Sequence, residues 1–191
     1  DDGPMNDRAA AERAGVGWFG KNTNILTPMH GSWVLLGQMI TDLELMADIP
    51  LAKNCGSCTR CIDACPTAAM VAPYVIDNRR CISFLAIELR DSITREMRPL
   101  VGDWVFGCDI CQDVCPVNRD VTRSLEPAFQ QRHDFSAPQL IPLLNLTDEE
   151  FRERFHNSPI KWVGLQCNVC VDLGNIGDPI AVPALANSLV V

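Results

Sequence analysis

The sequence predicts an α+β protein whose cysteine-rich, loop-rich part is followed by a helical part. Hydrophobic residues make up 47% of the chain and charged residues 21%, which is typical of a folded domain. Eight of the ten cysteines lie from Cys55 to Cys115: seven form two groups at intervals of three or four, and Cys81 stands between the groups. Beyond Pro116, helix N-cap signals precede apolar residues at helical spacing.

The amino-terminal part is predicted to contain a helix, a loop and a strand. Asp7 can cap a helix over 8–14, since alanine has a high helix propensity, and Gly15 ends it. A glycine-rich loop follows over 15–21. The apolar run 32–41 has the length of a buried strand.

Four further helices are predicted. Apolar residues recur on one helix face within 81–97. Thr147 and Glu150 have the capping-box spacing that opens one helix, and Pro159 suits the first turn of the next helix, which ends near Leu173. Asp178-Pro179 is an N-cap and N1 pair that opens another helix. Two short helices joined by a glycine-containing turn are typical of an α-solenoid unit.

The first cysteine group has the spacing of a bacterial ferredoxin. C-x2-C-x2-C-x3-C-P binds one [4Fe–4S] cluster through its first three thiolates, and its fourth cysteine ligates the other cluster. The matching residues are Cys55, Cys58, Cys61 and Cys65, followed by Pro66. The sequence therefore predicts a two-cluster ferredoxin-like domain.

The second group, Cys108-x2-Cys111-x3-Cys115-Pro116, repeats this ending without a first cysteine, and Cys81 can replace it. Exchange of the fourth ligands divides the eight cysteines into two sets. One cluster is expected on Cys55, Cys58, Cys61 and Cys115, and the other on Cys65, Cys81, Cys108 and Cys111. Two zinc sites are the alternative, but structural zinc usually takes well-separated ligand pairs. Cys167 and Cys170 lie outside both groups and are predicted to be buried packing residues.

The net charge and the cysteine spacing limit the classes of function and the cellular compartment that the sequence allows. A net charge of −8 excludes a general nucleic-acid binder, because phosphate contacts need Lys and Arg. No apolar run approaches the roughly 20 residues that cross a bilayer, and no signal peptide opens the sequence. The cysteine spacing and the lack of an export signal indicate a reducing, cytoplasmic location. The sequence starts at Asp1 without an initiator methionine and ends at Val191 within a helical pattern, which suggests that it is a fragment.

Several motifs beyond the cysteines resemble the epoxyqueuosine reductase family. They are DRAAAERAGVGWFGKNT at 7–23, GSW at 31–33, NCGSC at 54–58, RCISFL at 80–85, GCDICQ at 107–112 and LGN at 173–175. The resemblance implies a reductive-dehalogenase-like core portion and a HEAT-like repeat. The implied domains are the carboxyl-terminal part of a cobalamin-binding catalytic domain at 1–50, a two-cluster domain at 51–120 and a truncated helical repeat at 121–191.

The resemblance also implies an activity: reduction of epoxyqueuosine to queuosine at the wobble position of tRNA. Electrons from an unidentified donor would pass through two [4Fe–4S] clusters to cobalamin. An aspartate acts as the general acid in this family, and the matching position is Asp1; Asp7 is a second carboxylate nearby. The expected cobalamin contacts are Asp1, Lys21, Asn22, Thr23, Ser83, Cys108 and Asp109. Lys21, Asn22 and Thr23 could instead contact tRNA.

Two other functions fit parts of the sequence. A reductive-dehalogenase-like corrinoid enzyme would share the clusters and cobalamin but act on a small substrate, which needs no helical repeat surface. A non-catalytic, ferredoxin-type electron-transfer module would need no loop of the kind found over 15–23. The protein is expected to be monomeric, with no membrane partner.

Overall fold

The computed structural model describes residues 5–130 and 138–188, and the chain folds into two compact units. The first unit comprises Asp1–Ile76 and Ile110–Leu125, and the second comprises Asp77–Asp109 and Glu126–Val191. Asp1, the predicted general acid, lies outside the described residues. Within these residues, no helix is long and apolar enough to cross a membrane.

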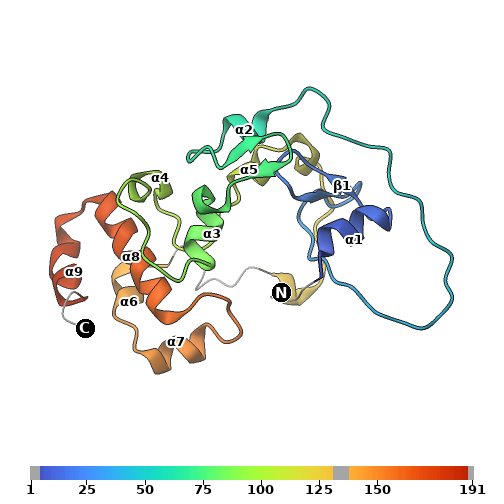
Figure 1. Ribbon diagram of the computed structural model, residues 1–191. Helices are drawn as coiled ribbons and strands as arrows, with labels where there is room; N and C mark the ends of the chain where they lie inside the picture. The colour runs from blue at the N-terminus through green and yellow to red at the C-terminus, as the bar shows by residue number, and fades with distance from the viewer. Residues whose placement is uncertain (1–4, 131–137, 189–191) are drawn as a thin grey trace. The chain divides into compact units, whose positions relative to one another are not determined.

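The first unit has short elements joined by long loops (Figure 1). Its two-stranded antiparallel sheets pair β1 with β2 and β3 with β4. The elements are α1 (Asp7–Arg13), β1 (Trp18–Phe19), β2 (Ile25–Leu26), α2 (Arg60–Asp63), β3 (Met70–Ala72), β4 (Val75–Ile76), α5 (Ile110–Asp113) and the 3-10 turn η2 (Pro116–Asn118). Its buried apolar side chains are few: Ala11, Trp18, Ile25, Leu26, Ala69 and Met70.

The predicted first helix exists, but Asn6 caps it instead of Asp7. The Asn6 side chain accepts a hydrogen bond from the Ala9 backbone N–H, which makes Asp7 the first residue of α1. Asp7 Oδ1 accepts a hydrogen bond of 2.7 Å from Gln38 Nε2. Either Asn or Asp can be an N-cap, so the sequence alone could not fix the helix start to one residue.

The strand predicted over 32–41 is wrong. Within the described part of the chain these residues form no strand, and the chain from 33 to 50 is an open loop in Figure 1. Its large side chains are unusually exposed: 85% for Leu35, 90% for Met39 and 97% for Met46. A strand needs a partner for its backbone hydrogen bonds, and no described residue supplies one.

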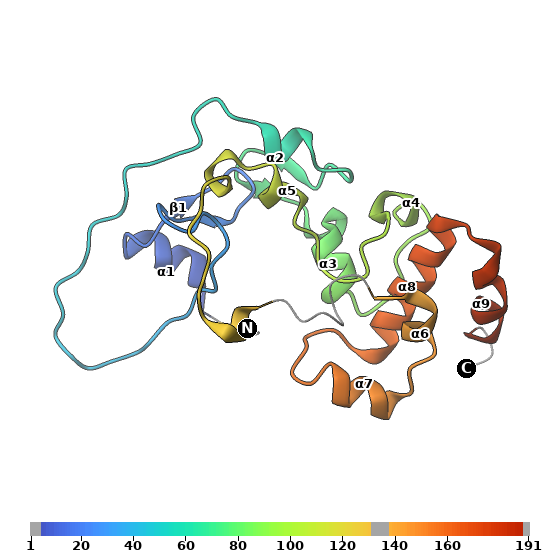
Figure 2. The ribbon, with the colours of Figure 1, turned by 180° about the vertical axis from the view of Figure 1, so that it is seen from behind.

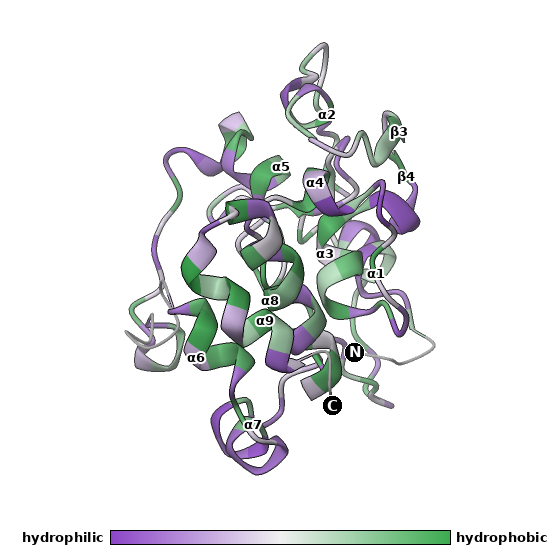
Figure 3. Ribbon diagram, turned by 90° about the vertical axis from the view of Figure 1, so that its left-hand side faces the viewer, coloured by the Kyte–Doolittle hydropathy of each residue, from purple (hydrophilic) through white to green (hydrophobic). Residues whose placement is uncertain are grey.

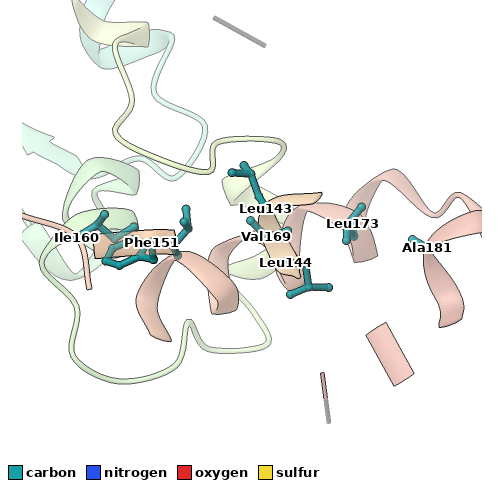
Figure 4. Packing of buried hydrophobic residues seen from close by; sticks show 8 residues of the cluster. Leu143, Leu144, Phe151, Ile160, Val169, Leu173 and Ala181 are labelled. Atoms are coloured by element: carbon teal, nitrogen blue, oxygen red, sulfur yellow. The ribbon is translucent and has the colours of Figure 1, made fainter. Parts of the chain in front are cut away.

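The second unit is helical. Its elements are the 3-10 turn η1 (Asn78–Arg80), α3 (Ile82–Ile87), α4 (Arg98–Val101), η3 (Pro127–Phe129), α6 (Leu140–Leu144), α7 (Asp148–Arg154), α8 (Trp162–Ile176), η5 (Pro179–Ala181) and α9 (Val182–Ser188). The main apolar cluster consists of Leu143, Leu144, Phe151, Ile160, Leu165, Val169, Leu173 and Ala181 (Figure 4). Hydropathy colouring shows a largely hydrophobic α6 beside the more hydrophilic α7 (Figure 3).

The predicted caps of this unit are confirmed. Thr147 and Glu150 form a reciprocal capping box at α7, and the Asp178 side chain accepts from Ile180 N at η5. Two boundaries differ from the prediction: α3 ends at Ile87, and α8 begins at Trp162, after Pro159. Gly177, with φ +70°, ends α8 in the left-handed conformation that glycine favours.

Candidate metal centre

The two cysteine groups of the sequence have the same backbone geometry in the structure. α2 carries Cys61 and α5 carries Cys111, and each helix is four residues long. Cys65 N donates to Ile62 O, and Cys115 N donates to Gln112 O in the same way. The two helices also pack against each other. The local repeat expected from the sequence is therefore present in the backbone, including the turn at each Cys-Pro.

Burial and the charges of neighbouring cysteines act on two thiols of the first unit, Cys61 and Cys115. Burial raises the pKa of Cys61, and the charges of Cys55 and Cys115 raise it further. Burial also raises the pKa of Cys115, with contributions from Cys55 and Cys58. These four residues are the predicted ligands of one cluster. Positive iron at this place would favour the thiolates and reverse the rise, as a metal ion does for coordinating thiols.

The turn that begins the first group relies on glycine and on a buried lysine. Gly56 has φ +51°, and its N–H donates to Asn54 Oδ1 over 2.8 Å. Lys21, which is only 9% exposed, donates from Nζ to Gly56 O at 2.7 Å and to Cys58 O at 2.9 Å. The ammonium thus ties the loop after β1 to the backbone that presents Cys55 and Cys58.

The residue after this lysine contacts the other cysteine group. Asn22 Nδ2 donates to Cys111 O over 3.4 Å, while Asn22 Oδ1 accepts from Asn24 N. Thr23, at φ +66°, is held by Arg8, whose guanidinium donates to the Thr23 carbonyl and hydroxyl. Lys21 and Asn22 are therefore attached to the cysteine loops. The predicted contacts of Lys21, Asn22 and Thr23 with cobalamin or tRNA stay predictions.

A buried polar network, which the sequence did not reveal, holds the second cysteine group. Asn118 Oδ1 accepts from Ser32 N, and Asn118 Nδ2 donates to Ser32 Oγ and Gln112 O, each over 2.8 Å. Ser32 Oγ donates to Gln112 Oε1. A Cβ on Gly31 would lie 2.0 Å from Asn118 Oδ1, so only glycine fits there. The segment that follows η2, residues 119–125, passes beside the turn that contains Gly31, where Thr122 N donates to Met29 O (Figure 2).

Cys65 differs electrostatically from Cys61 and Cys115. Burial raises its pKa, but hydrogen bonds from the Thr67 side chain and from the backbone N–H groups of Ala69, Thr67 and Met70 outweigh burial, so the pKa is lowered. Ala69 N lies 3.3 Å from Cys65 Sγ. Backbone N–H groups directed at sulfur are typical of iron–sulfur ligands.

The other predicted ligands belong to different units. Cys65 and Cys111 lie in the first unit, and Cys81 and Cys108 lie in the second. Cys81 is the N-cap residue of α3, beside the half-buried Ser83 in its first turn, and Cys108 packs against the apolar cluster around Ile82. The joint cluster of these four cysteines stays a prediction from the sequence, as do the contacts expected of Ser83 and Asp109.

The donor set fits an iron–sulfur cubane better than a single metal ion. Within residues 5–130 and 138–188, no three His, Cys, Asp or Glu side chains converge closely enough to hold one ion. A zinc ion draws four ligands to one atom, whereas a cubane receives each thiolate at a separate iron corner, so its ligands stand farther apart. The fold and this site are those of an iron–sulfur protein. Residues 54–118 match the family model of the 4Fe-4S double cluster binding domain.

Comparison with known proteins shows that the chain is similar to epoxyqueuosine reductases over nearly its whole length, as the motifs predict. The chain is 44% identical over 178 residues to the epoxyqueuosine reductase of Shewanella oneidensis, covering 92% of this chain and 45% of that protein. It is 41% identical over 188 residues to the Bacillus subtilis enzyme, covering 97% of this chain and 48% of that protein. The chain thus spans about half the length of these relatives.

The fold agrees with the sequence likeness. A crystal structure of epoxyqueuosine reductase with a tRNA-Tyr epoxyqueuosine-modified stem loop superimposes with a TM-score of 0.92 at 39% identity. The match covers 98% of this chain and 50% of that structure. The non-cysteine motifs at 7–23 and 173–175 were therefore correct indicators of this similarity.

Proposed function

We propose that this chain supplies the electron-transfer part of an enzyme that reduces epoxyqueuosine to queuosine in tRNA. The observation that carries the proposal is the match, over nearly the whole chain, to a structure that holds an epoxyqueuosine-modified stem loop. A non-catalytic ferredoxin-type module would need only 54–118, yet the likeness extends well beyond both ends of that domain. A tRNA substrate is also favoured over a small halogenated one, because the matched structure holds a tRNA stem loop.

We assign eight cysteines to two [4Fe–4S] clusters, in the sets that the sequence predicts. Lys21 orients the first ligand loop by holding two of its carbonyl groups, and Asn22 contacts the second loop. When bound, the clusters supply single electrons and cobalamin supplies the cobalt ion that these electrons reduce. Removing an epoxide oxygen as water consumes two electrons and two protons, so a proton donor must lie beside the substrate.

Asp1 is the proposed proton donor, acting on the oxygen released from the epoxide. Asp7 is the weaker candidate, because its carboxylate in α1 already accepts a hydrogen bond from Gln38. A carboxyl group donates a proton near neutral pH only where its surroundings raise its pKa.

The proposed domain division explains why the loop over 33–49 exposes apolar side chains. Within 1–50, the large apolar side chains of the segment 33–49 are largely exposed. We infer that this part packs within a larger cobalamin-binding domain of reductive-dehalogenase-like fold, which would cover those side chains. We also infer that the helices α8 and α9 belong to a HEAT-like repeat within 121–191.

The nucleoside content of tRNA tests the function directly. A strain that lacks the gene should accumulate epoxyqueuosine and lose queuosine, and a plasmid copy should restore queuosine. A copy with Asp1→Asn should bind its cofactors and tRNA but fall roughly 10²–10⁴-fold in turnover, the usual loss for a general acid. Asp7→Asn should convert normally. An unchanged nucleoside profile in the deletion strain refutes the function, and an inactive Asp7 variant beside an active Asp1 variant refutes the acid assignment.

A further inference from the structure

Cys167 and Cys170 have no role in the proposed electron path. Both lie on α8 and line a groove of about 1020 Å³ in the second unit. Cys167 is exposed, which contradicts the predicted burial of this pair, and Cys170 is half-buried. Cys170 Sγ lies 3.7 Å from Ser188 Oγ. One solvent-accessible thiol and one partly buried thiol therefore share the wall of one groove.

The spacing of the pair excludes a disulfide as long as α8 stays helical. Residues three apart lie on the same helix face with Cβ atoms about 5–6 Å apart, whereas a disulfide needs about 3.5–4.5 Å. Two sulfurs at helical spacing can instead approach one atom between them. The two thiols interact electrostatically. Burial is the largest cause that raises the pKa of Cys167, the charge of Cys170 raises it further, and the charge of Arg98 lowers it.

From this geometry we propose that Cys167 and Cys170 bind one thiophilic monovalent cation, Cu(I), between their two sulfurs. Thiolates select soft ions such as Cu(I) and Zn(II). Structural zinc usually needs four strong ligands, and within the described parts of the chain no third His, Cys, Asp or Glu converges with this pair. Two thiolates suffice for Cu(I), which accepts linear coordination.

The charge balance supports a monovalent ion. Binding breaks two S–H bonds, releases two protons and forms two Cu–S bonds, with no change in oxidation state. Two thiolates and one Cu(I) leave a net charge of −1. Arg98 lies within electrostatic reach of Cys167, so its guanidinium offsets that charge. The Ser188 hydroxyl can turn from its bond to Leu185 O and donate to the thiolate of Cys170.

The test is an anaerobic titration of the cluster-loaded protein with Cu(I) in competition with a chromogenic Cu(I) chelator. Loaded clusters occupy the other eight thiols. We expect one equivalent of Cu(I) to transfer to the protein, with unchanged iron content and cluster absorption. Cys167→Ser and Cys170→Ser should each abolish the transfer. Gln166→Ala, in the same groove and on the same helix, should leave it intact and serves as the matched control.

Two further measurements complete the test. Because two protons leave, the affinity for Cu(I) should rise about 100-fold for each pH unit below the thiol pKa values. Equal Cu(I) uptake by the serine variants, or uptake matched by iron loss, would overturn the proposal, since the ion would then sit on cluster thiols. A disulfide between the two cysteines after mild oxidation, seen by peptide mass in protein with an intact α8, would overturn the geometric argument.

Discussion

The two units of this chain are stabilised by different kinds of interaction. The second unit has two clusters of buried aliphatic and aromatic side chains, one along α6, α7 and α8 and one around α3 and α4. The first unit instead places polar side chains at its centre, with Lys21 and Asn118 bonded to the backbone of the two cysteine groups. Burial of apolar area drives folding of ordinary domains, so a unit with little of it needs another source of stability.

Metal binding can stabilise a unit that contains a set of metal ligands. The free energy of cluster binding counts toward folding, because the unfolded chain has no preformed site. The stability of the first unit is therefore expected to depend on its cofactor more than the stability of the second unit does.

Removal of the clusters should produce the largest effect. With an iron chelator under reducing conditions, we expect the backbone of 54–72 and 110–118 to lose its protection from hydrogen exchange. The amides of α8 should retain most of theirs, because Leu165, Val169 and Leu173 stay buried in an apolar core. Hydrogen exchange resolved by peptide measures both regions in one sample. Equal loss of protection in α8 would mean that the two units fold only together.

Replacement of Lys21 should affect the first unit alone. Lys21→Met keeps the length and apolar stem of the side chain but leaves two buried carbonyl groups without their charged donor, a loss of about 1.5–3 kcal/mol per bond. We expect a lower iron content and faster cluster loss in air. Lys53→Met is the matched control, since the ammonium of Lys53 lies over the face of the Trp18 ring. Similar iron retention in both variants would refute the role of Lys21.

A buried carboxyl group should make the second unit sensitive to pH. Asp172 in α8 is fully buried, and neither carboxylate oxygen has a hydrogen-bond partner among the described residues. Burial and the nearby charge of Asp103 raise its pKa from 3.8 to about 7. A raised pKa means that folding favours the protonated acid. The free energy of unfolding therefore falls as the pH rises from about 4 to about 7, by at most about 4 kcal/mol.

Asp172→Asn tests this dependence, because Asn resembles the neutral acid and cannot ionise. We expect the stability of the variant and the parent to be similar near pH 4 and to diverge up to pH 7, with the variant more stable. Urea denaturation of the cluster-free chain, followed by helical circular dichroism, measures the gap. Asp178→Asn, at the exposed cap of η5, is the control. A gap that stays constant between pH 4 and pH 8 would contradict the raised pKa.

Local sequence signals predicted the parts of this structure that depend on neighbouring residues. The caps at Thr147 and Asp178 are of this kind, and so is the local repeat of the two cysteine groups that end in Cys-Pro. The signals failed where distant residues decide. The segment 32–41 has no strand partner among the described residues, so its predicted strand does not form.

In the candidate site, too, local sequence signals predicted some features and contacts between distant residues were missed. Ligand spacing identified the cysteines, since their separation along the chain is the signal. Nothing in the sequence pairs Ser32 with Asn118, which lie 86 residues apart and meet through hydrogen bonds. The exposure of Cys167 was also missed, because a residue's place around α8 depends on which helix face the unit buries.

The capping box of α7 should give the smallest effect and confine it to the second unit. Thr147 Oγ1 accepts from Glu150 N over 3.2 Å, and Glu150 Oε2 accepts from Thr147 N over 2.8 Å. Thr147→Ala leaves the N-terminal amides of α7 without this acceptor, a cost of about 1 kcal/mol. Thr147→Ser keeps the hydroxyl and should cost much less. Faster hydrogen exchange in α7 of the alanine variant, with unchanged iron content, is the expected result. A loss of iron in that variant would show that cluster binding also depends on α7, and the contrast between the two units would then be one of degree.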